Sequence, residues 1–203
     1  MRPYRYNSTQ KDEIEQQIQQ LLANGWIQES QSPYASPILL VKKKIGDWHL
    51  CVDYRKLNAL TVKNKFPLSV IDELLDELVG AQWFTTLDMS LGFHQILVAE
   101  EDIAKTTFQT HSGHYEYKVM PYGVTGGLAT FQHEMNTVFA LVLRKCAVVF
   151  IDDILIYNKT WEEHLAHLQQ VFTLLLKHQF KVKLSKCAFA KQELSYLGHV
   201  ISS

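Results

Sequence analysis

The chain has 203 residues, of which 47% are hydrophobic and 20% charged, and its formal net charge is −1. These values exclude a disordered chain and favour one domain, or two closely packed subdomains, of a soluble globular protein. No apolar run approaches the ~20 residues of a membrane helix, and the first residues lead us to expect no secretory signal. Three distant cysteines favour a reducing compartment over a disulfide framework.

Apolar spacing and turn residues divide the first 127 residues into short helices and strands. Thr9 and Asp12 are expected to cap the first helix, which Asn24-Gly25 ends, and Ser69 to cap the second. Gly46 and Gly113 mark predicted turns. The predicted elements are a helix over 9–24, strands over 38–42 and 47–54, a helix over 69–80, and strands over 83–90, 93–100, 106–110 and 114–120.

The remaining residues continue the same mixture. Thr160 and Glu163 have the spacing of a capping box and predict the start of a helix. The predicted elements are a helix over 128–144, strands over 148–151 and 154–157, a helix over 160–175, and strands over 181–189 and 194–202. Helices and strands that follow one another without strict alternation predict an α+β fold, in which an antiparallel sheet packs on helices.

Two adjacent acids, Asp152 and Asp153, interrupt the apolar stretch "CAVVFIDDILIYNKT". Mid-strand, one of them would enter the core, where an unpaired carboxylate is costly. We therefore predict a hairpin with these acids at its tip, and a divalent cation would offset their repulsion. Asp88 ends the strand "WFTTLD" in the same way and would supply a third carboxylate. An acidic hairpin tip without a ligand is the alternative.

Several ordered segments extend this pattern. "FIDDILIY" resembles the aromatic-x-Asp-Asp box of reverse transcriptases, and "LDMSLGFHQI" resembles the segment with their other catalytic aspartate. "KKKIGDWHLCVDYRKLN", "FPLSVIDELLDEL", "MPYGVTGGLATFQ", "WEEHLAHL" and "SYLGHVIS" match in the same order. From about residue 2 to residue 203, the chain resembles the reverse transcriptase of gypsy-type long-terminal-repeat retrotransposon Pol polyproteins.

The resemblance implies a right-hand polymerase fold with an antiparallel palm sheet. Fingers would cover about residues 1–65 and 93–120, and palm about 66–92 and 121–203. The chain stops at Ser203, where the thumb would begin, so we expect the thumb to be absent.

The resemblance also implies an RNA-directed DNA polymerase, a nucleotidyltransferase that joins a dNTP to a primer 3′-hydroxyl. Asp88, Asp152 and Asp153 would be catalytic and would bind two Mg²⁺ ions, with the Met89 backbone carbonyl as a further ligand and Mn²⁺ as a substitute. A metal-dependent nuclease is a third and more distant reading, because nothing outside the acids supports it.

Further roles follow only from the resemblance. Residues implied to bind dNTP are Lys43, His49, Gly92, Phe93, Tyr122 and Gly123. Residues implied to contact template or primer are Asp53, Arg55, Gly126, Gly127, Leu197 and Gly198. Expected partners are an RNA or DNA template with primer, dNTP, and the protease, RNase H and integrase regions of a longer Pol product used in DNA integration. We expect a cytoplasmic retroelement particle or the nucleus, and no membrane.

Four departures from the family pattern would weaken an enzyme. His49 stands where the family has an arginine that grips the triphosphate, and histidine is mostly neutral at pH 7. Ser90-Leu91 replace Arg-Ser, Gly126-Gly127-Leu128 replace Asn-Ala-Pro, and the thumb is expected to be absent. A non-enzymatic retroelement remnant that folds and binds nucleic acid is therefore the alternative function.

Residues 164–192 contain five lysines and three histidines but no acid. Such a stretch can follow a phosphate backbone, or it can be a solvated helix face. We expect His164 and His167 to be surface residues rather than zinc ligands.

Overall fold

The computed structural model describes residues 4–42, 46 and 48–202. The chain forms two compact units. Unit 1 comprises residues 1–64 and 93–127, and unit 2 comprises residues 65–92 and 128–203. Both units are built from two chain segments, so each depends on contacts between residues far apart in the sequence.

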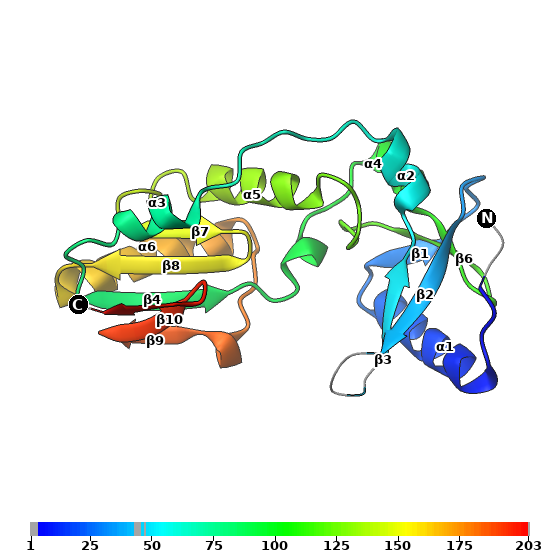
Figure 1. Ribbon diagram of the computed structural model, residues 1–203, viewed down its shortest axis with the longest axis horizontal. Helices are drawn as coiled ribbons and strands as arrows, with labels where there is room; N and C mark the ends of the chain where they lie inside the picture. The colour runs from blue at the N-terminus through cyan, green and yellow to red at the C-terminus, as the bar shows by residue number, and fades with distance from the viewer. Residues whose placement is uncertain (1–3, 43–45, 47, 203) are drawn as a thin grey trace. The chain divides into compact units, whose positions relative to one another are not determined.

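Unit 1 packs helices on a five-stranded sheet with strand order β1-β6-β5-β2-β3. Its pairs are antiparallel except β2 with β5, which are parallel. The elements, labelled in Figure 1 where there is room, are α1 (Ser8–Ala23), β1 (Ile27–Glu29), β2 (Ser36–Lys42), β3 (Trp48–Val52), α2 (Arg55–Leu60), α4 (Glu100–Ile103), the 3₁₀ turn η2 (Ala104–Thr106), β5 (Phe108–Gln109) and β6 (His114–Tyr117).

The cap of helix α1 lies two residues earlier than its sequence indicates. Asn7, rather than Thr9, is the N-cap, and it forms a reciprocal capping box with Gln10. An asparagine followed three residues later by glutamine satisfies two free N–H groups, which explains the choice. The predicted end is confirmed, since Asn24 is the C-cap and Gly25 follows with φ of 69°.

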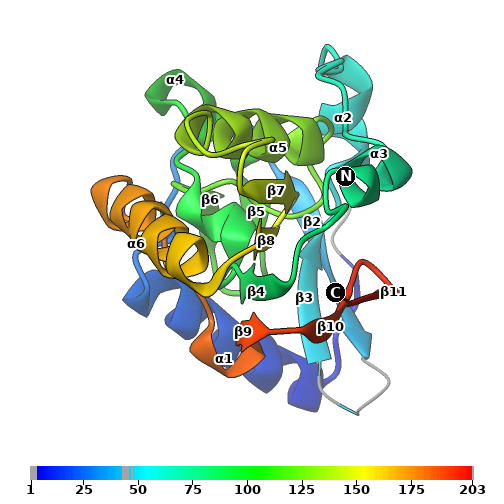
Figure 2. The same cartoon turned by 90° about the vertical axis from the view of Figure 1, so that its left-hand side faces the viewer.

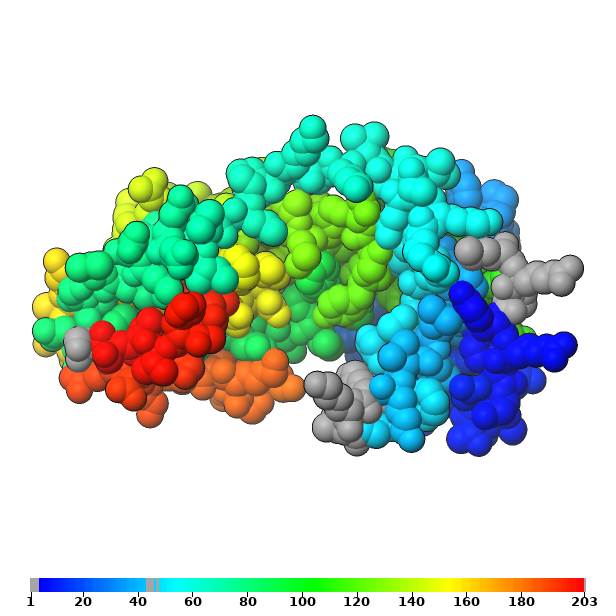
Figure 3. Space-filling view, viewed as in Figure 1, coloured from blue at the N-terminus to red at the C-terminus, as the bar shows by residue number. Residues whose placement is uncertain are grey.

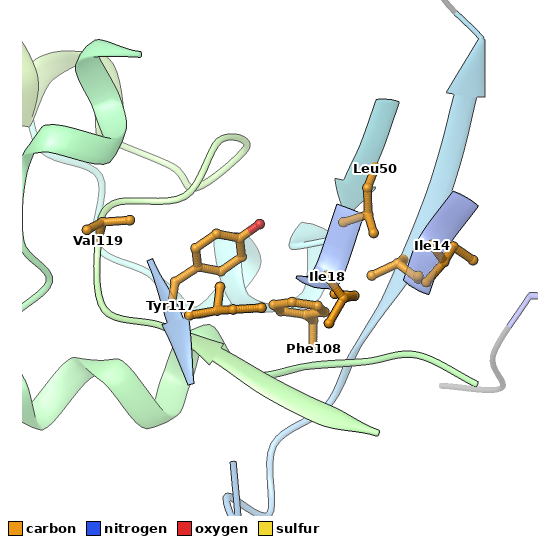
Figure 4. Close-up of a cluster of buried hydrophobic side chains, with 8 residues drawn as sticks. Ile14, Ile18, Leu50, Phe108, Tyr117 and Val119 are labelled. Atoms are coloured by element: carbon orange, nitrogen blue, oxygen red, sulfur yellow. The ribbon is translucent and has the colours of Figure 1, made fainter. Parts of the chain in front are cut away.

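The core of unit 1 lies between α1 and the sheet. Figure 4 shows Ile14 and Ile18 from α1 facing Leu50, Phe108 and Tyr117 from three strands. The rings of Phe108 and Tyr117 lie 5.3 Å apart. Burial of these apolar side chains holds the short strands β5 and β6 in place.

The prediction of a strand over residues 93–100 is wrong. Residues Gly92–Gln95 form the 3₁₀ turn η1 instead, and Leu97 makes only an isolated bridge to Val119. The ring of His94 packs 4.6 Å from Trp26, so this segment folds inward. Side-chain packing at His94 therefore outweighs the alternation on which the prediction rested.

Unit 2 contains a four-stranded antiparallel sheet with strand order β7-β8-β4-β9 and a separate β10–β11 hairpin. Its elements are α3 (Ile71–Asp76), β4 (Trp83–Asp88), α5 (Gly127–Val138), β7 (Ala147–Phe150), β8 (Asp153–Asn158), α6 (Trp161–Lys177), the 3₁₀ turn η3 (Leu184–Lys186), β9 (Ala188–Lys191), β10 (Glu193–Tyr196) and β11 (His199–Ser202).

Both faces of this sheet are covered. Phe84 and Leu155 pack with Leu74 of α3 and Tyr196 of β10, whereas Thr85 faces α6. Figure 2 shows α6 on one side of the sheet and the β10–β11 hairpin on the other. This hairpin lies at the surface of unit 2 in Figure 3, where it is red. Strands buried on both faces explain the continuous apolar runs of β7 and β8.

Several predictions in unit 2 need correction. Val70, not Ser69, precedes α3, and no side chain caps it. Helix α5 ends at Val138, six residues before the predicted end. The segment 181–189 is not one strand, because η3 interrupts it. The capping box of Thr160 and Glu163 is confirmed.

In the described part of the chain, no helix is both long and apolar enough to cross a membrane.

Candidate active site

Two strand ends in unit 2 bring the acids together. Asp88 is the last residue of β4, and Asp153 is the first residue of β8. The two are direct partners in the antiparallel β4–β8 ladder. Cross-strand partners have Cβ atoms about 5 Å apart. The predicted neighbourhood of Asp88 and the paired acids therefore exists at one edge of the sheet.

The hairpin tip lies one residue earlier than predicted. Phe150 pairs with Asp153, so Ile151 and Asp152 form the turn. Ile151 has φ of 53°. A β-branched residue in the left-handed region is strained, and glycine is usual at such a position in a two-residue hairpin. The backbone N–H of Met89 donates to the Asp152 carbonyl at 3.1 Å, which ties the tip to the end of β4.

A lysine from a distant segment contacts this cluster. The backbone N–H of Lys183 donates to the Asp88 carbonyl at 2.8 Å, so residues 181–186 run beside the end of β4. Lys186 then donates from Nζ to Oδ2 of Asp88 at 2.9 Å. The Asp88 side chain is 19% exposed and that of Lys186 56% exposed, so solvent screens the pair only partly.

Charge shapes the site. Burial raises the pKa of Asp153, and the neighbouring charges of Asp152 and Asp88 raise it further, while Lys186 opposes the shift. The hydrogen bond to Asp88 raises the pKa of Lys186. Neighbouring carboxylates destabilise the ionised form of Asp153, and a bound cation would stabilise that form.

The donor set fits a hard divalent cation, since all three side chains offer carboxylate oxygens at neighbouring backbone positions. Lys186 shows that the cluster already attracts a positive charge. The side chains are not gathered around one point, however. Among the described residues, no group of three histidine, cysteine, aspartate or glutamate side chains is arranged to hold a metal ion.

Gln132 of α5 supports the tip, and sequence reasoning missed it. Its side chain is fully buried. It accepts a hydrogen bond from the Ile151 N–H at 2.7 Å and donates one to the Val149 carbonyl at 3.0 Å. A glutamine on the polar edge of an amphipathic helix carries no sequence signal for such a contact.

Two residues beside Asp88 show how tightly the chain turns there. A Cβ added to Gly92 would lie 2.9 Å from the ring of Phe131, so only glycine fits. Leu91 has φ of 50° and is 51% exposed. Close packing against Phe131 therefore explains why glycine stands at position 92, while its role in dNTP binding stays a prediction.

In unit 1, several predicted nucleotide-binding residues share one hollow. His49, Tyr122 and Gly123 line a cavity of about 720 Å³. The ring of Phe93 lies 5.0 Å from that of Tyr122. Lys43 lies outside the described residues. The cavity brings three of the named positions together, with Phe93 beside Tyr122, but it does not test what they bind.

Asn58 holds the loop that carries these residues. Its side chain donates to the Gly123 carbonyl at 2.8 Å and accepts from the Thr125 N–H at 2.7 Å. Gly126 follows this loop with φ of 81°, and Gly127 begins α5. No local sequence pattern marks Asn58 as the residue that holds the loop at Gly123 and Thr125.

Asp53 and Arg55 form a close pair in unit 1. Oδ1 of Asp53 accepts from Nε of Arg55 at 2.8 Å, and Oδ2 accepts from Nη2 at 2.7 Å. These bonds lower the pKa of Asp53 despite its burial. The exposed guanidinium is thereby oriented by a buried carboxylate, an arrangement that suits phosphate contact.

The predicted primer-gripping residues form a tight turn in unit 2. Leu197 and Gly198 connect β10 to β11, and both have positive φ, 49° and 84°. The hydroxyl of the preceding Tyr196 donates to the Asp153 carbonyl at 3.3 Å. This turn is therefore joined through one residue to the backbone of the acid cluster.

The histidine prediction is wrong for His164, which is fully buried. Its Nε2 lies 2.8 Å from the Thr85 hydroxyl, and its Nδ1 lies 2.9 Å from Oδ1 of Asn158. His167 is half-buried and lies 2.6 Å from the Asn158 amide nitrogen. The two histidines expected at the surface therefore belong to a hydrogen-bonded network with Thr85 and Asn158.

Comparison with known proteins places this site in a family. Residues 41–201 match the family described as "Reverse transcriptase (RNA-dependent DNA polymerase)". The chain is 43% identical, over 98% of its length, to the Retrovirus-related Pol polyprotein from transposon 297 of Drosophila melanogaster. It is 34% identical, over 94% of its length, to the polyprotein from transposon gypsy of the same organism. The chain spans 19% of each of these relatives.

Solved structures agree with this family. The foamy viral protease-reverse transcriptase in complex with RNA/DNA hybrid aligns with a TM-score of 0.89 and 27% identity, over 100% of this chain and 27% of that one. Its dRH form in complex with double-stranded DNA aligns with a TM-score of 0.88 and 28% identity, over 100% of this chain and 35% of that one. The fold is that of a right-hand polymerase, and the chain belongs to the reverse transcriptase family.

Proposed function

We propose that the chain is the RNA-directed DNA polymerase domain of a gypsy-type retrotransposon Pol polyprotein and transfers a nucleotide from dNTP to a primer 3′-hydroxyl. The observation that carries the proposal is the pairing of Asp88 with Asp153 across two strand ends, with Asp152 at the adjoining tip. Unit 1 would be the fingers and unit 2 the palm. Protease, RNase H and integrase regions would belong to the same Pol product.

Asp88, Asp152 and Asp153 would hold two Mg²⁺ ions, or Mn²⁺ in their place, with the Met89 carbonyl beside them. When bound, such ions activate the primer hydroxyl and stabilise the charge that develops on the leaving pyrophosphate. The chain's own part is to keep three carboxylates at one sheet edge. The Met89–Asp152 hydrogen bond joins the hairpin tip to the end of β4 and so supports this arrangement.

The substrate roles named from the resemblance complete the proposal. Phe93, Tyr122 and Gly123 would contact the dNTP, and His49 would replace a stronger phosphate ligand. Arg55, held by Asp53, would contact the template. Nucleic-acid contact from the lysine-rich stretch 177–191 would make binding sensitive to salt.

The test is incorporation of one nucleotide by the full chain on an RNA template with a DNA primer, at low salt with Mg²⁺ or Mn²⁺. Wild type should extend the primer, and D88N and D152N should not. Asp76 is an exposed acid of the same unit, so D76N is the matched control and should keep activity. Incorporation no greater than that of D152N would overturn the proposal.

The alternative is a chain that binds nucleic acid without polymerising. His49 and the exposed, strained Leu91 favour it. Retention of primer–template by wild type without any incorporation, even after His49→Arg, would support this alternative instead.

A further inference from the structure

The hairpin tip that carries the acids has an unusual backbone. A two-residue turn with positive φ at its first central position normally has glycine there. This chain has Ile151 at that position, with φ of 53°. The β-branched side chain disfavours the left-handed region, so the tip needs an outside contact to stay in this conformation.

Gln132 supplies that contact from α5. Its amide oxygen accepts from the Ile151 N–H at 2.7 Å, and its amide nitrogen donates to the Val149 carbonyl at 3.0 Å. One side chain thus binds the backbone on both sides of Phe150. The same nitrogen donates to Oδ1 of Asn136 at 2.8 Å, which fixes the orientation of the amide.

The clamp is buried, so water cannot replace it. Gln132 has no exposed surface. Loss of its side chain would leave the Val149 carbonyl and the part-buried Ile151 N–H without this partner. The strained turn would then relax, and with it the backbone that leads into Asp152 and Asp153.

We propose that Gln132 is a positioning residue of the acid cluster: it holds Ile151 in the left-handed conformation so that Asp152 and Asp153 stay beside Asp88. The consequence for divalent cations rests on the proposed function, whereas the backbone effect does not. Gln132 touches no reacting atom and acts only through the turn.

The test compares Q132M, I151G and the double variant in the full chain. Methionine keeps the length of the side chain but removes both hydrogen bonds. Glycine adopts positive φ without strain, so I151G removes the need for the clamp. The control T85V loses a buried hydrogen bond to His164 in the same sheet, away from the tip.

Two readouts are measured, namely Mn²⁺ affinity by electron paramagnetic resonance of the free ion, and hydrogen exchange of the Ile151 amide. We expect Q132M to weaken Mn²⁺ binding about tenfold and to speed exchange at Ile151 at least about tenfold. The double variant should recover Mn²⁺ affinity to within about threefold of wild type. T85V should lower the thermal midpoint but change neither readout at the tip.

Unchanged exchange at Ile151 in Q132M, or exchange that rises equally in T85V, would overturn the clamp. If the double variant binds Mn²⁺ as weakly as Q132M does, Gln132 does not act on the acids through the conformation of Ile151. A wild-type chain that binds no Mn²⁺ would contradict only the proposed function. Hydrogen exchange at Ile151 would still show whether Gln132 holds the turn.

Discussion

Asp153→Asn should stabilise the chain at pH 8, because this residue opposes folding when ionised. Asp153 lies directly opposite Asp88, and burial and the acidic neighbours raise its pKa. A folded pKa above the unfolded value means that the folded chain holds the proton more tightly. The ionised carboxylate therefore costs stability above both pKa values, and this cost declines as the pH falls from the raised folded value toward the unfolded value.

The size of the effect follows from the strand pairing. Like charges that face each other across a ladder cost roughly 0.2–1 kcal/mol, and the partial burial of Asp153 favours the upper end. For a chain of this length, about 1 kcal/mol corresponds to a rise of about 2–4 °C in the thermal midpoint. Asparagine has nearly the same shape, so packing should not change.

The assay is thermal unfolding at pH 8 and at pH 4.5 without divalent ions. D153N should melt about 2–4 °C above wild type at pH 8, with a smaller difference at pH 4.5. The exposed Asp76 serves as the control, and D76N should shift the midpoint by less than about 1 °C. A D153N midpoint below wild type at pH 8, or a gain that is equal at both pH values, would refute the electrostatic reasoning.

Three further outcomes are expected. Lys186→Met should tighten Mn²⁺ binding about threefold or more, since the Asp88-bound ammonium competes with the ion; calorimetric titration that shows equal or weaker binding would contradict this. Burial lowers the pKa of His94 to about 4, with a smaller contribution from His49. Stability present above pH 6.5 should therefore be lost progressively as the pH drops to about 4. His94→Phe should remove this loss in urea unfolding, whereas an unchanged pH profile would count against it. His49→Arg should lower the KM for dNTP about tenfold in steady-state extension, and an unchanged KM would remove the argument from the missing arginine.

The sequence was most informative where a polar residue broke an apolar run. Asp88 and Asp153 end and begin buried strands, so their meeting at one sheet edge follows from strand pairing alone. The capping box at Thr160 and the end of α1 at Asn24 rest on local backbone chemistry and are confirmed for the same reason.

Contacts between distant segments could not be foreseen. Gln132, Lys186 and Asn58 reach their partners only after the chain has folded, and none stands in a local pattern that marks it. His164 is buried because it shares the face of α6 that carries Leu168, Val171 and Leu175, and Thr85 and Asn158 provide its polar partners from two strands. The one-residue shift of the hairpin tip has a similar origin, because Gln132 supports a conformation that Ile151 alone would avoid.

The central claim is that Asp88, Asp152 and Asp153 form the metal cluster of a polymerase. The most direct measurement is Mn²⁺ bound per chain in the presence of primer–template and a non-hydrolysable dNTP, paired with single-nucleotide incorporation from a reactive dNTP. We predict about two ions per chain and incorporation in wild type, with both reduced in D88N and D152N. Incorporation that persists in D88N, or wild-type incorporation without bound ions, would contradict the claim.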